Sequence, residues 1–262
     1  TAARTPLVLG LNMGLGDPQY PAAAAAALRA GLPPNFIRNF ELGNEPDLYA
    51  TARAYSVGRN VRVRQRKRPE GYGYNQYRRE VNEHVAAIHP AAPDVDLAGG
   101  GFASGSWDDL QGSILSAQPS VRTWSAHAYP LQTCDKNIRR RGGLRYIPKL
   151  LAPNAYSSIV DRMRHLVAVA ASHGGQVQVS EMNSAICGGL RGVSDTMASA
   201  LWGTDMLFGL AEAGVRNVDL HTWTGSIYGP IDWRRENGQT VAKVRPLFYA
   251  MLLFNRATPP GS

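Results

Sequence analysis

Two glutamates in similar local settings are the residues of this chain best suited to do chemistry. Glu45 lies in the string Phe40-Glu41-Leu42-Gly43-Asn44-Glu45-Pro46-Asp47, directly after a short apolar run. Glu181 follows the strand-like run Val177-Gln178-Val179-Ser180. Each carboxylate therefore stands where a buried strand is expected to open into a loop. Two carboxylic acids at two strand ends are suited to glycoside hydrolysis, in which one is the general acid and the other the nucleophile or base.

Six short apolar runs, alternating with segments of helical period, are expected to position these glutamates. The strands are predicted near residues 7–11, 36–42, 95–98, 123–126, 176–179 and 218–220. Ser194 predicts a helix N-cap, and Pro246 predicts the start of the final helix. The alternation is typical of βα units around a parallel sheet, so we predict an α/β fold of the (β/α)8 TIM-barrel type.

A complete barrel of this type has eight βα units, and only six strands are visible in the sequence. Because the chain begins abruptly at a strand, the absent pair is expected upstream, which makes the visible strands numbers three to eight. Glu45 then follows strand four and Glu181 follows strand seven. We predict that residues 1–262 form a single, partial barrel catalytic domain.

Composition and charge favour a globular protein with an anionic partner. The chain has 44% hydrophobic and 18% charged residues, which is typical of a globular protein, and it contains neither a signal peptide nor a membrane-length apolar run. The net charge of +8 favours an anionic partner. No nucleic-acid-binding motif is present, so nucleic acid is not an expected partner. A membrane is not expected either, because no apolar run is long enough. The basic residues gather in two predicted loops, at Arg53, Arg59, Arg62, Arg64, Arg66, Lys67 and Arg68, and at Lys136, Arg139, Arg140, Arg141 and Arg145.

The two cysteines, Cys134 and Cys187, lack the spacing of metal ligands or of a redox Cys-x-x-Cys pair. No metal site is therefore expected. Both cysteines fall in loops on one face of the predicted barrel, so a disulfide between them is plausible in an oxidising compartment. Two unpaired thiols are the alternative.

Several local strings resemble glycoside hydrolase family 79, which includes β-glucuronidases and heparanase. They are Gly10-Leu11-Asn12, Glu41-Leu42-Gly43-Asn44-Glu45-Pro46-Asp47, His127-Ala128-Tyr129 and Ser180-Glu181-Met182-Asn183-Ser184, in the order in which the family has them. The resemblance covers nearly the whole chain but only the later part of the family's barrel. It also implies a C-terminal β-sandwich domain, which these 262 residues do not include.

This resemblance implies a retaining hydrolase of β-glucuronides or of a uronate-containing glycan, in which Glu45 is the acid/base and Glu181 the nucleophile. No cofactor is implied. A secreted or periplasmic location follows from the resemblance together with the possible disulfide. The candidate substrate-binding residues are Asn44 beside the acid, His127 and Tyr129 at a strand end, Asn183, Gly188 and Gly189 in the loop after the nucleophile, and Trp223.

Each supporting residue also has a plainer interpretation. Asn44 could simply form a loop, His127 could be a satisfied core residue, and Trp223 could pack instead of offering an aromatic platform to a sugar. The loop with Gly188 and Gly189, whose amides could hold a uronate carboxylate, could be an ordinary turn.

Three other functions stay open. The two glutamates could act on a neutral sugar such as a glucoside, xyloside or arabinoside. The chain could be an inactive barrel fragment that binds glycans only. A basic nucleic-acid binder is the remaining alternative, and it would show salt-sensitive retention of DNA or RNA.

Overall fold

The structure is a computed structural model that describes residues 5–33, 35–51, 68–135, 137–138 and 143–258. Contacts between Cα atoms divide the chain into two compact units. Unit 1 comprises Thr1–His127 and Leu166–Ser180, and unit 2 comprises Ala128–His165 and Glu181–Ser262. The prediction of a single domain stays a prediction.

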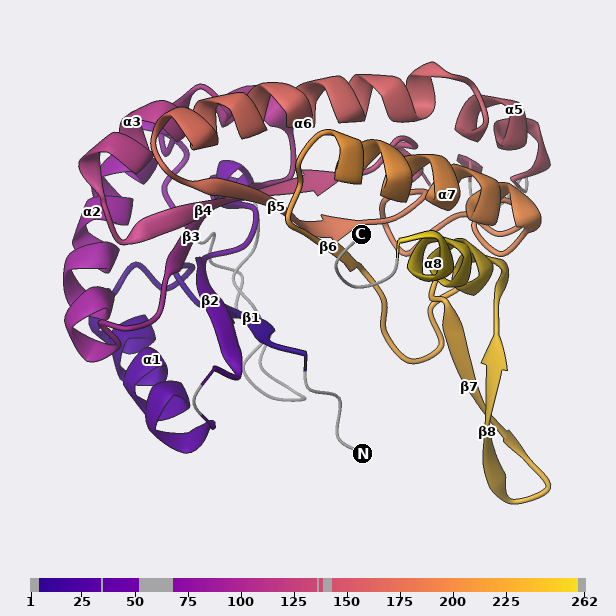
Figure 1. The fold of residues 1–262 in the computed structure, drawn as a ribbon, viewed down its shortest axis with the longest axis horizontal. Helices are drawn as coiled ribbons and strands as arrows, with labels where there is room; N and C mark the ends of the chain where they lie inside the picture. The colour runs from indigo at the N-terminus through magenta and orange to yellow at the C-terminus, as the bar shows by residue number, and fades with distance from the viewer. Residues whose placement is uncertain (1–4, 34, 52–67, 136, 139–142, 259–262) are drawn as a thin grey trace. The chain divides into compact units, whose positions relative to one another are not determined.

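Unit 1 is built on five strands that follow one another in the sheet in sequence order. The strands are β1 (Leu7–Leu11), β2 (Ile37–Leu42), β3 (Leu97–Phe102), β4 (Val121–Ala128) and β5 (Gln176–Met182), the last residues of β4 and β5 passing into unit 2. The ladders from β1 to β4 are parallel. The connections carry α1 (Gln19–Gly31), α2 (Tyr74–Ala91) and α3 (Leu110–Ala117), with the short 3₁₀ helices η1 (Pro46–Leu48) and η2 (Gly105–Trp107) (Figure 1).

The central strands β3 and β4 are buried on both faces along almost their whole length, which suits a parallel sheet covered by helices, whereas β1 is largely half-buried or exposed. Phe40, Leu97 and Trp124 are fully buried core residues from three neighbouring strands. The glycine run in β3 makes room for the Trp124 ring. Gly100 has φ +91, and a Cβ there would lie 2.4 Å from the Ser125 carbonyl oxygen, so only glycine fits.

Unit 2 contains the last strand of the sheet, β6 (Asn217–Leu220), beside the end of β5, where the His221 amide donates to the Met182 carbonyl. Its helices are α5 (Ile147–Leu150), the first part of α6 (Asn154–Ser172), α7 (Met197–Glu212) and α8 (Pro246–Ala257), with the short 3₁₀ helix η3 (Leu144–Tyr146). The helices α7 and α8 pack closely, and a Cβ on Gly203 would lie 2.7 Å from Leu247 (Figure 1).

An antiparallel hairpin of β7 (Ile231–Glu236) and β8 (Gln239–Val244) was not predicted. Its turn is Asn237-Gly238, with φ +49 and +79, and Asn-Gly between alternating residues is a strong hairpin signal. The strongly charged strands hid this signal, because Arg234, Arg235 and Glu236 interrupt the apolar alternation that predicts a strand.

The prediction of an α/β fold is confirmed, and Pro246 opens α8 as expected. The predicted N-cap at Ser194 is wrong. Helix α7 begins at Met197 after Thr196, because the Ser194 hydroxyl is engaged with the Leu190 amide and the Ser184 hydroxyl instead. Among the described residues, every helix is too short or too polar to cross a lipid bilayer.

Candidate active site

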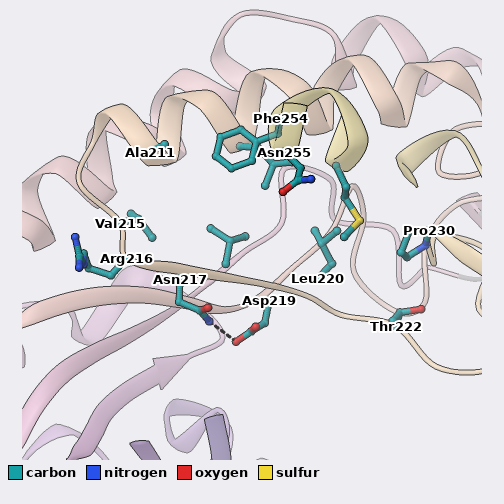
Figure 2. A pocket seen from close by; sticks show the side chains of 13 residues that line it. Ala211, Val215, Arg216, Asn217, Asp219, Leu220, Thr222, Pro230, Phe254 and Asn255 are labelled. Carbon is teal, nitrogen blue, oxygen red and sulfur yellow. Dashed lines mark hydrogen bonds between the residues drawn. The ribbon is translucent and has the colours of Figure 1, made fainter. Parts of the chain in front are cut away.

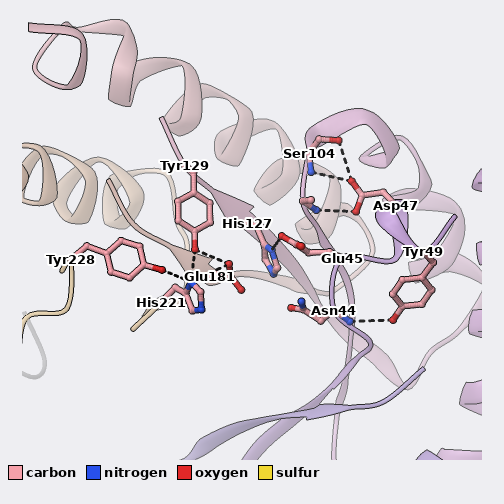
Figure 3. Close-up of polar contacts among 11 residues, drawn as sticks. Asn44, Glu45, Asp47, Tyr49, Ser104, His127, Tyr129, Glu181, His221 and Tyr228 are labelled. Atoms are coloured by element: carbon pink, nitrogen blue, oxygen red, sulfur yellow. Dashed lines mark hydrogen bonds and ion pairs between the residues drawn. The ribbon is translucent and has the colours of Figure 1, made fainter. Parts of the chain in front are cut away.

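Glu45 lies just after β2, at the N-terminus of η1, in unit 1. Its backbone has φ 49 and ψ 54, a left-handed conformation that non-glycine residues seldom adopt. The Glu45 amide donates to the Gly101 carbonyl at 2.8 Å. Its carboxylate Oε1 lies 3.2 Å from Nδ1 of His127 (Figure 3). The side chain is 30% exposed, so a ligand can reach it, whereas the His127 side chain is only 1% exposed.

A buried polar layer occupies the same face of the strands in unit 1. The Glu41 carboxylate accepts from the Ser125 hydroxyl at 2.7 Å and from the Gln178 amide at 3.2 Å. Gln178 also accepts from the Asn39 amide at 2.9 Å. Because side chains alternate along a strand, His127 shares the face of Ser125. Burial raises the pKa of Glu41, although its hydrogen-bond donors and His127 oppose the shift.

Glu181 lies in unit 2, near the end of β5, and is held by a cluster of rings. The Tyr129 hydroxyl donates to Glu181 Oε1 at 2.7 Å and lies 2.9 Å from Nδ1 of His221. The Tyr228 hydroxyl lies 2.7 Å from the same nitrogen, and that nitrogen is 3.5 Å from Glu181 Oε1 (Figure 3). Glu181 therefore sits at one end of a continuous chain of hydrogen-bonding groups.

The tyrosines of this cluster stay protonated at neutral pH. Burial, with the hydrogen bond to the Glu181 carboxylate as the next cause, raises the pKa of Tyr129. Burial raises the pKa of Tyr228 to about 12. Tyr129 is thus a permanent hydrogen-bond donor to Glu181, which orients the carboxylate.

Trp223 stands at the rim of this cluster with 50% of its surface exposed. Its ring centroid is 5.5 Å from that of His221 and 5.6 Å from that of Tyr228. Gly188 has φ +85 and packs against the ring, since a Cβ there would lie 2.9 Å from Trp223. The Trp223 ring is half-exposed and packs against His221, Tyr228 and Gly188. An exposed aromatic ring fixed in this way could stack against the apolar face of a sugar. Gly189, also at φ +85, is buried between Ile227, Ser194 and Tyr228.

Two of the predicted substrate contacts are buried. Asn183 is fully buried, and its amide donates to the carbonyls of His221 and Tyr228, which fastens the loops of unit 2. His127 is also buried, and it contacts Glu45. Asn44 is exposed, and its backbone amide donates to the Tyr49 hydroxyl at 3.4 Å, which leaves the side chain accessible.

The basic clusters are largely outside the described residues: this applies to Arg53, Arg59, Arg62, Arg64, Arg66 and Lys67, and to Lys136, Arg139, Arg140 and Arg141. Arg68, which belongs to the first basic cluster, is only 8% exposed. Its guanidinium binds Glu80 and the carbonyls of Met13 and Gly14, so its charge is already paired within the protein. Arg145 is exposed, and its guanidinium lies 5.1 Å from the Tyr146 ring.

Two grooves lie within unit 2. One of about 440 Å³ begins at Tyr129 and includes Lys149, Asn154 and Ser158 in its lining. The other, of about 640 Å³, lies between α7, β6 and α8, with Leu220 and Phe254 among its apolar residues and an Asn217 to Asp219 hydrogen bond of 2.8 Å on its polar side (Figure 2). The first groove includes Tyr129, whose hydroxyl donates to Glu181.

Cys134 and Cys187 form a disulfide, with Cα atoms 5.3 Å apart, in agreement with the paired alternative. Near them, Leu131 and Ala185 form an isolated parallel β-bridge, and the Thr133 hydroxyl donates to the Ile186 carbonyl. The bond thus ties the loop after Tyr129 to the loop after Glu181.

We expect Cys134→Ser/Cys187→Ser to lower the free energy of unfolding by about 4 kcal/mol, because the bond closes a 53-residue loop in the unfolded chain. The melting temperature should fall by roughly 10 °C. Thermal unfolding with and without dithiothreitol measures this. The reductant should lower the wild-type value to that of the double variant and leave the variant unchanged; equal melting temperatures in all four samples would contradict the prediction.

Sequence reasoning missed His221, Tyr228 and Glu41 as members of these clusters. The string His221-Thr222-Trp223 after the last strand was a usable signal, because polar residues at a strand end of this fold class face the functional edge. Tyr228 carried no signal, since only the loop after β6 brings it back to His221.

No family model and no curated protein matches this chain. Several solved structures share its fold. A 4-O-α-L-rhamnosyl-β-D-glucuronidase from Fusarium oxysporum 12S aligns over 96% of this chain and 50% of its own, with a TM-score of 0.69 and 17% identity. A family 51 α-L-arabinofuranosidase from Bifidobacterium longum aligns over 97% and 52%, with a TM-score of 0.62 and 16% identity.

A family 51 arabinofuranosidase from Xanthomonas axonopodis pv. citri has a TM-score of 0.63 at 14% identity, covering 95% of this chain and 52% of that one. The chain thus spans about half the length of these solved structures. The chain shares its fold with glycoside hydrolases, which is consistent with a partial barrel of the α/β type.

Proposed function

We propose that this chain carries the two catalytic glutamates of a retaining glycoside hydrolase, with Glu45 as acid/base and Glu181 as nucleophile. The best support is that each glutamate lies at a strand end and contacts the side chain of a histidine or a tyrosine. His127 is 3.2 Å from Glu45, and Tyr129 donates to Glu181 at 2.7 Å. A nucleophile must be oriented, and an acid/base must be reachable by the leaving group, which the partial exposure of Glu45 allows.

The double displacement uses these groups in a defined order. Glu181 attacks the anomeric carbon while Glu45 donates its proton to the departing oxygen, and a covalent glycosyl-enzyme forms. Glu45 then removes a proton from water as the water oxygen attacks the anomeric carbon and the bond to Glu181 breaks, which frees the Glu181 carboxylate and releases the sugar with its original configuration. The Tyr129 hydroxyl, which keeps its proton, stays hydrogen-bonded to the carboxylate before attack and after release.

We propose a β-glucuronide or a uronate-containing glycan as the substrate. The net charge of +8, and Lys149 in the groove that begins at Tyr129, favour an anionic sugar. The name of the Fusarium protein, a β-D-glucuronidase, supports the same choice. Trp223 and the loop of Gly188 and Gly189 are the proposed contacts to the sugar face and to its carboxylate. The disulfide favours a secreted or periplasmic location for such an enzyme.

The sugar is tested by comparing 4-nitrophenyl β-D-glucuronide with 4-nitrophenyl β-D-glucoside. We expect kcat/KM to favour the glucuronide by at least about 10³-fold, because carboxylate-binding groups left without their partner penalise the neutral sugar. A preference for the glucoside would contradict the anionic substrate while leaving the two-glutamate mechanism in place.

A neutral pentose is the second candidate, since two solved structures with this fold are named arabinofuranosidases. 4-Nitrophenyl α-L-arabinofuranoside belongs in the same panel. Binding of glycans without turnover of any aryl glycoside would instead favour a glycan-binding fragment.

A further inference from the structure

Asp47 joins the loop that carries Glu45 to the end of the neighbouring strand β3, within unit 1 (Figure 3). Its Oδ1 accepts from the Ala103 amide at 2.9 Å. Its Oδ2 accepts from the Ser104 amide and from the Ser104 hydroxyl, both at 3.1 Å. Three donors therefore converge on one carboxylate, and none of them belongs to its own loop.

These contacts continue a pairing that the backbone cannot continue. The Glu45 amide donates to the Gly101 carbonyl at 2.8 Å, as in a parallel ladder. The next residue is Pro46, which has no amide hydrogen and starts the helix η1. In a continued ladder the Ala103 amide would donate to the Glu45 carbonyl, but that carbonyl accepts from the Leu48 amide at 3.0 Å within η1. The Asp47 carboxylate accepts from the amides of Ala103 and Ser104 instead. The loop is thus fastened to β3 at two points, one on each side of Pro46.

The contacts of Asp47 lie next to Glu45, whose backbone conformation is unfavourable. Glu45 has φ 49, and a non-glycine residue holds this conformation only when its surroundings impose it. The Asp47 carboxylate, two residues further along, is partly buried, and this burial raises the pKa of Asp47 against the opposing effect of its hydrogen bonds. Its three hydrogen bonds to Ala103 and Ser104 lie next to the left-handed backbone of Glu45.

We propose that Asp47 is a positioning residue for Glu45: by binding the amides of Ala103 and Ser104, it holds Glu45 in the left-handed conformation that presents its carboxylate to the leaving group. This rests on the proposed role of Glu45 as acid/base. Asp47 itself contacts neither the sugar nor the reacting atoms.

The variant Asp47→Asn keeps the size of the side chain and removes one acceptor. The amide nitrogen must then face the amide of Ala103 or Ser104, donor against donor, so one contact opens. Glu45 can relax toward common backbone angles, and its carboxylate leaves its place beside His127. A displacement of about 1 Å in a catalytic group costs up to roughly 10²-fold in rate.

The test uses two leaving groups, because only one of them needs the acid. An alkyl β-D-glucuronide must be protonated as it departs, whereas 2,4-dinitrophenyl β-D-glucuronide departs without help. For Asp47→Asn we expect kcat/KM to fall about 10- to 100-fold on the alkyl substrate and less than about 3-fold on the dinitrophenyl substrate. Ser104→Ala loses one contact of the three and should show the same selectivity with a roughly 2- to 5-fold loss.

Ile114→Val, in the buried face of α3, is the control for loss of stability alone. It should lower the melting temperature by a few degrees with equal, small effects on both substrates. Equal losses on both substrates in Asp47→Asn would overturn the proposal. If Asp47→Asn does not fold, the selectivity of Ser104→Ala decides in the same way.

Amide hydrogen exchange tests whether Asp47 holds the loop in place, and it does not depend on enzymatic activity. Asp47→Asn should lower the protection of the amides of Glu45, Ala103 and Ser104, and Ile114→Val should leave them as protected as in the wild type. Unchanged protection of the Glu45 amide in Asp47→Asn would also overturn the proposal. If the wild type cleaves no aryl glycoside, the proposed function fails, and the exchange result still decides whether Asp47 positions Glu45.

Discussion

Glu181→Ala is expected to lower kcat/KM on an aryl β-glucuronide by at least about four powers of ten, because it removes the proposed nucleophile of the covalent step. Sodium azide should restore turnover. The small anion can enter the space left by the carboxylate and attack the same face of the sugar as Glu181 did, so the product is an α-glycosyl azide of inverted configuration.

The release rate of the phenol and the anomeric configuration of the azide product measure this result. Glu212→Ala is the matched control, since Glu212 is an exposed glutamate at the end of α7 in the same unit. It should behave as the wild type. Hydrolysis by Glu181→Ala at an undiminished rate, or a rescued product of retained configuration, would contradict the role of nucleophile.

Glu45→Ala is expected to have the second largest effect, with a loss that depends on the leaving group. An alkyl glucuronide should be cleaved about 10²- to 10⁴-fold more slowly, because its oxygen departs without a proton. With a dinitrophenyl leaving group the first step should stay fast and the glycosyl-enzyme should accumulate, since Glu45 is also the proposed base that activates water. Azide needs no base, so it should speed the second step and give a β-glycosyl azide of retained configuration.

The opposite configurations of the two azide products separate the two roles more sharply than rates alone. Glu83→Ala, an exposed position on α2 in the same unit as Glu45, provides the control. Equal losses on alkyl and dinitrophenyl substrates would show that Glu45 does not protonate the leaving group. In both active-site variants, an unchanged melting temperature is needed to assign the loss to chemistry.

The strands were predictable where apolar residues carry the signal, and less so where glycines do. β1 has the predicted bounds, whereas β3 was predicted to end near residue 98 and continues to Phe102. Gly99, Gly100 and Gly101 have a low intrinsic preference for strands. In the structure they belong to β3 nonetheless: Gly99 and Gly100 lie against the Trp124 ring, and Gly101 lies against the Glu41 carboxylate, so little space is left for side chains there.

The supporting residues were less predictable than the glutamates. Asn183 belongs to a matching string but is buried and fastens loops, while Tyr228 reaches His221 through a contact that no local pattern predicts. The hydroxyl, amide or ring of such a residue has the same sequence signal whether it faces a ligand or a backbone carbonyl. Only its surroundings decide.

Residue type and apolar periodicity are local properties, and together they were enough to place the candidate residues Glu45 and Glu181 at strand ends. What holds these two side chains depends on contacts made only after folding. His127 is 82 positions from Glu45 and Tyr129 is 52 from Glu181, and these pairs meet only through strand register. The left-handed backbone of Glu45, fastened by Asp47 to the end of β3, is likewise a product of folding, since no local preference of a glutamate favours it.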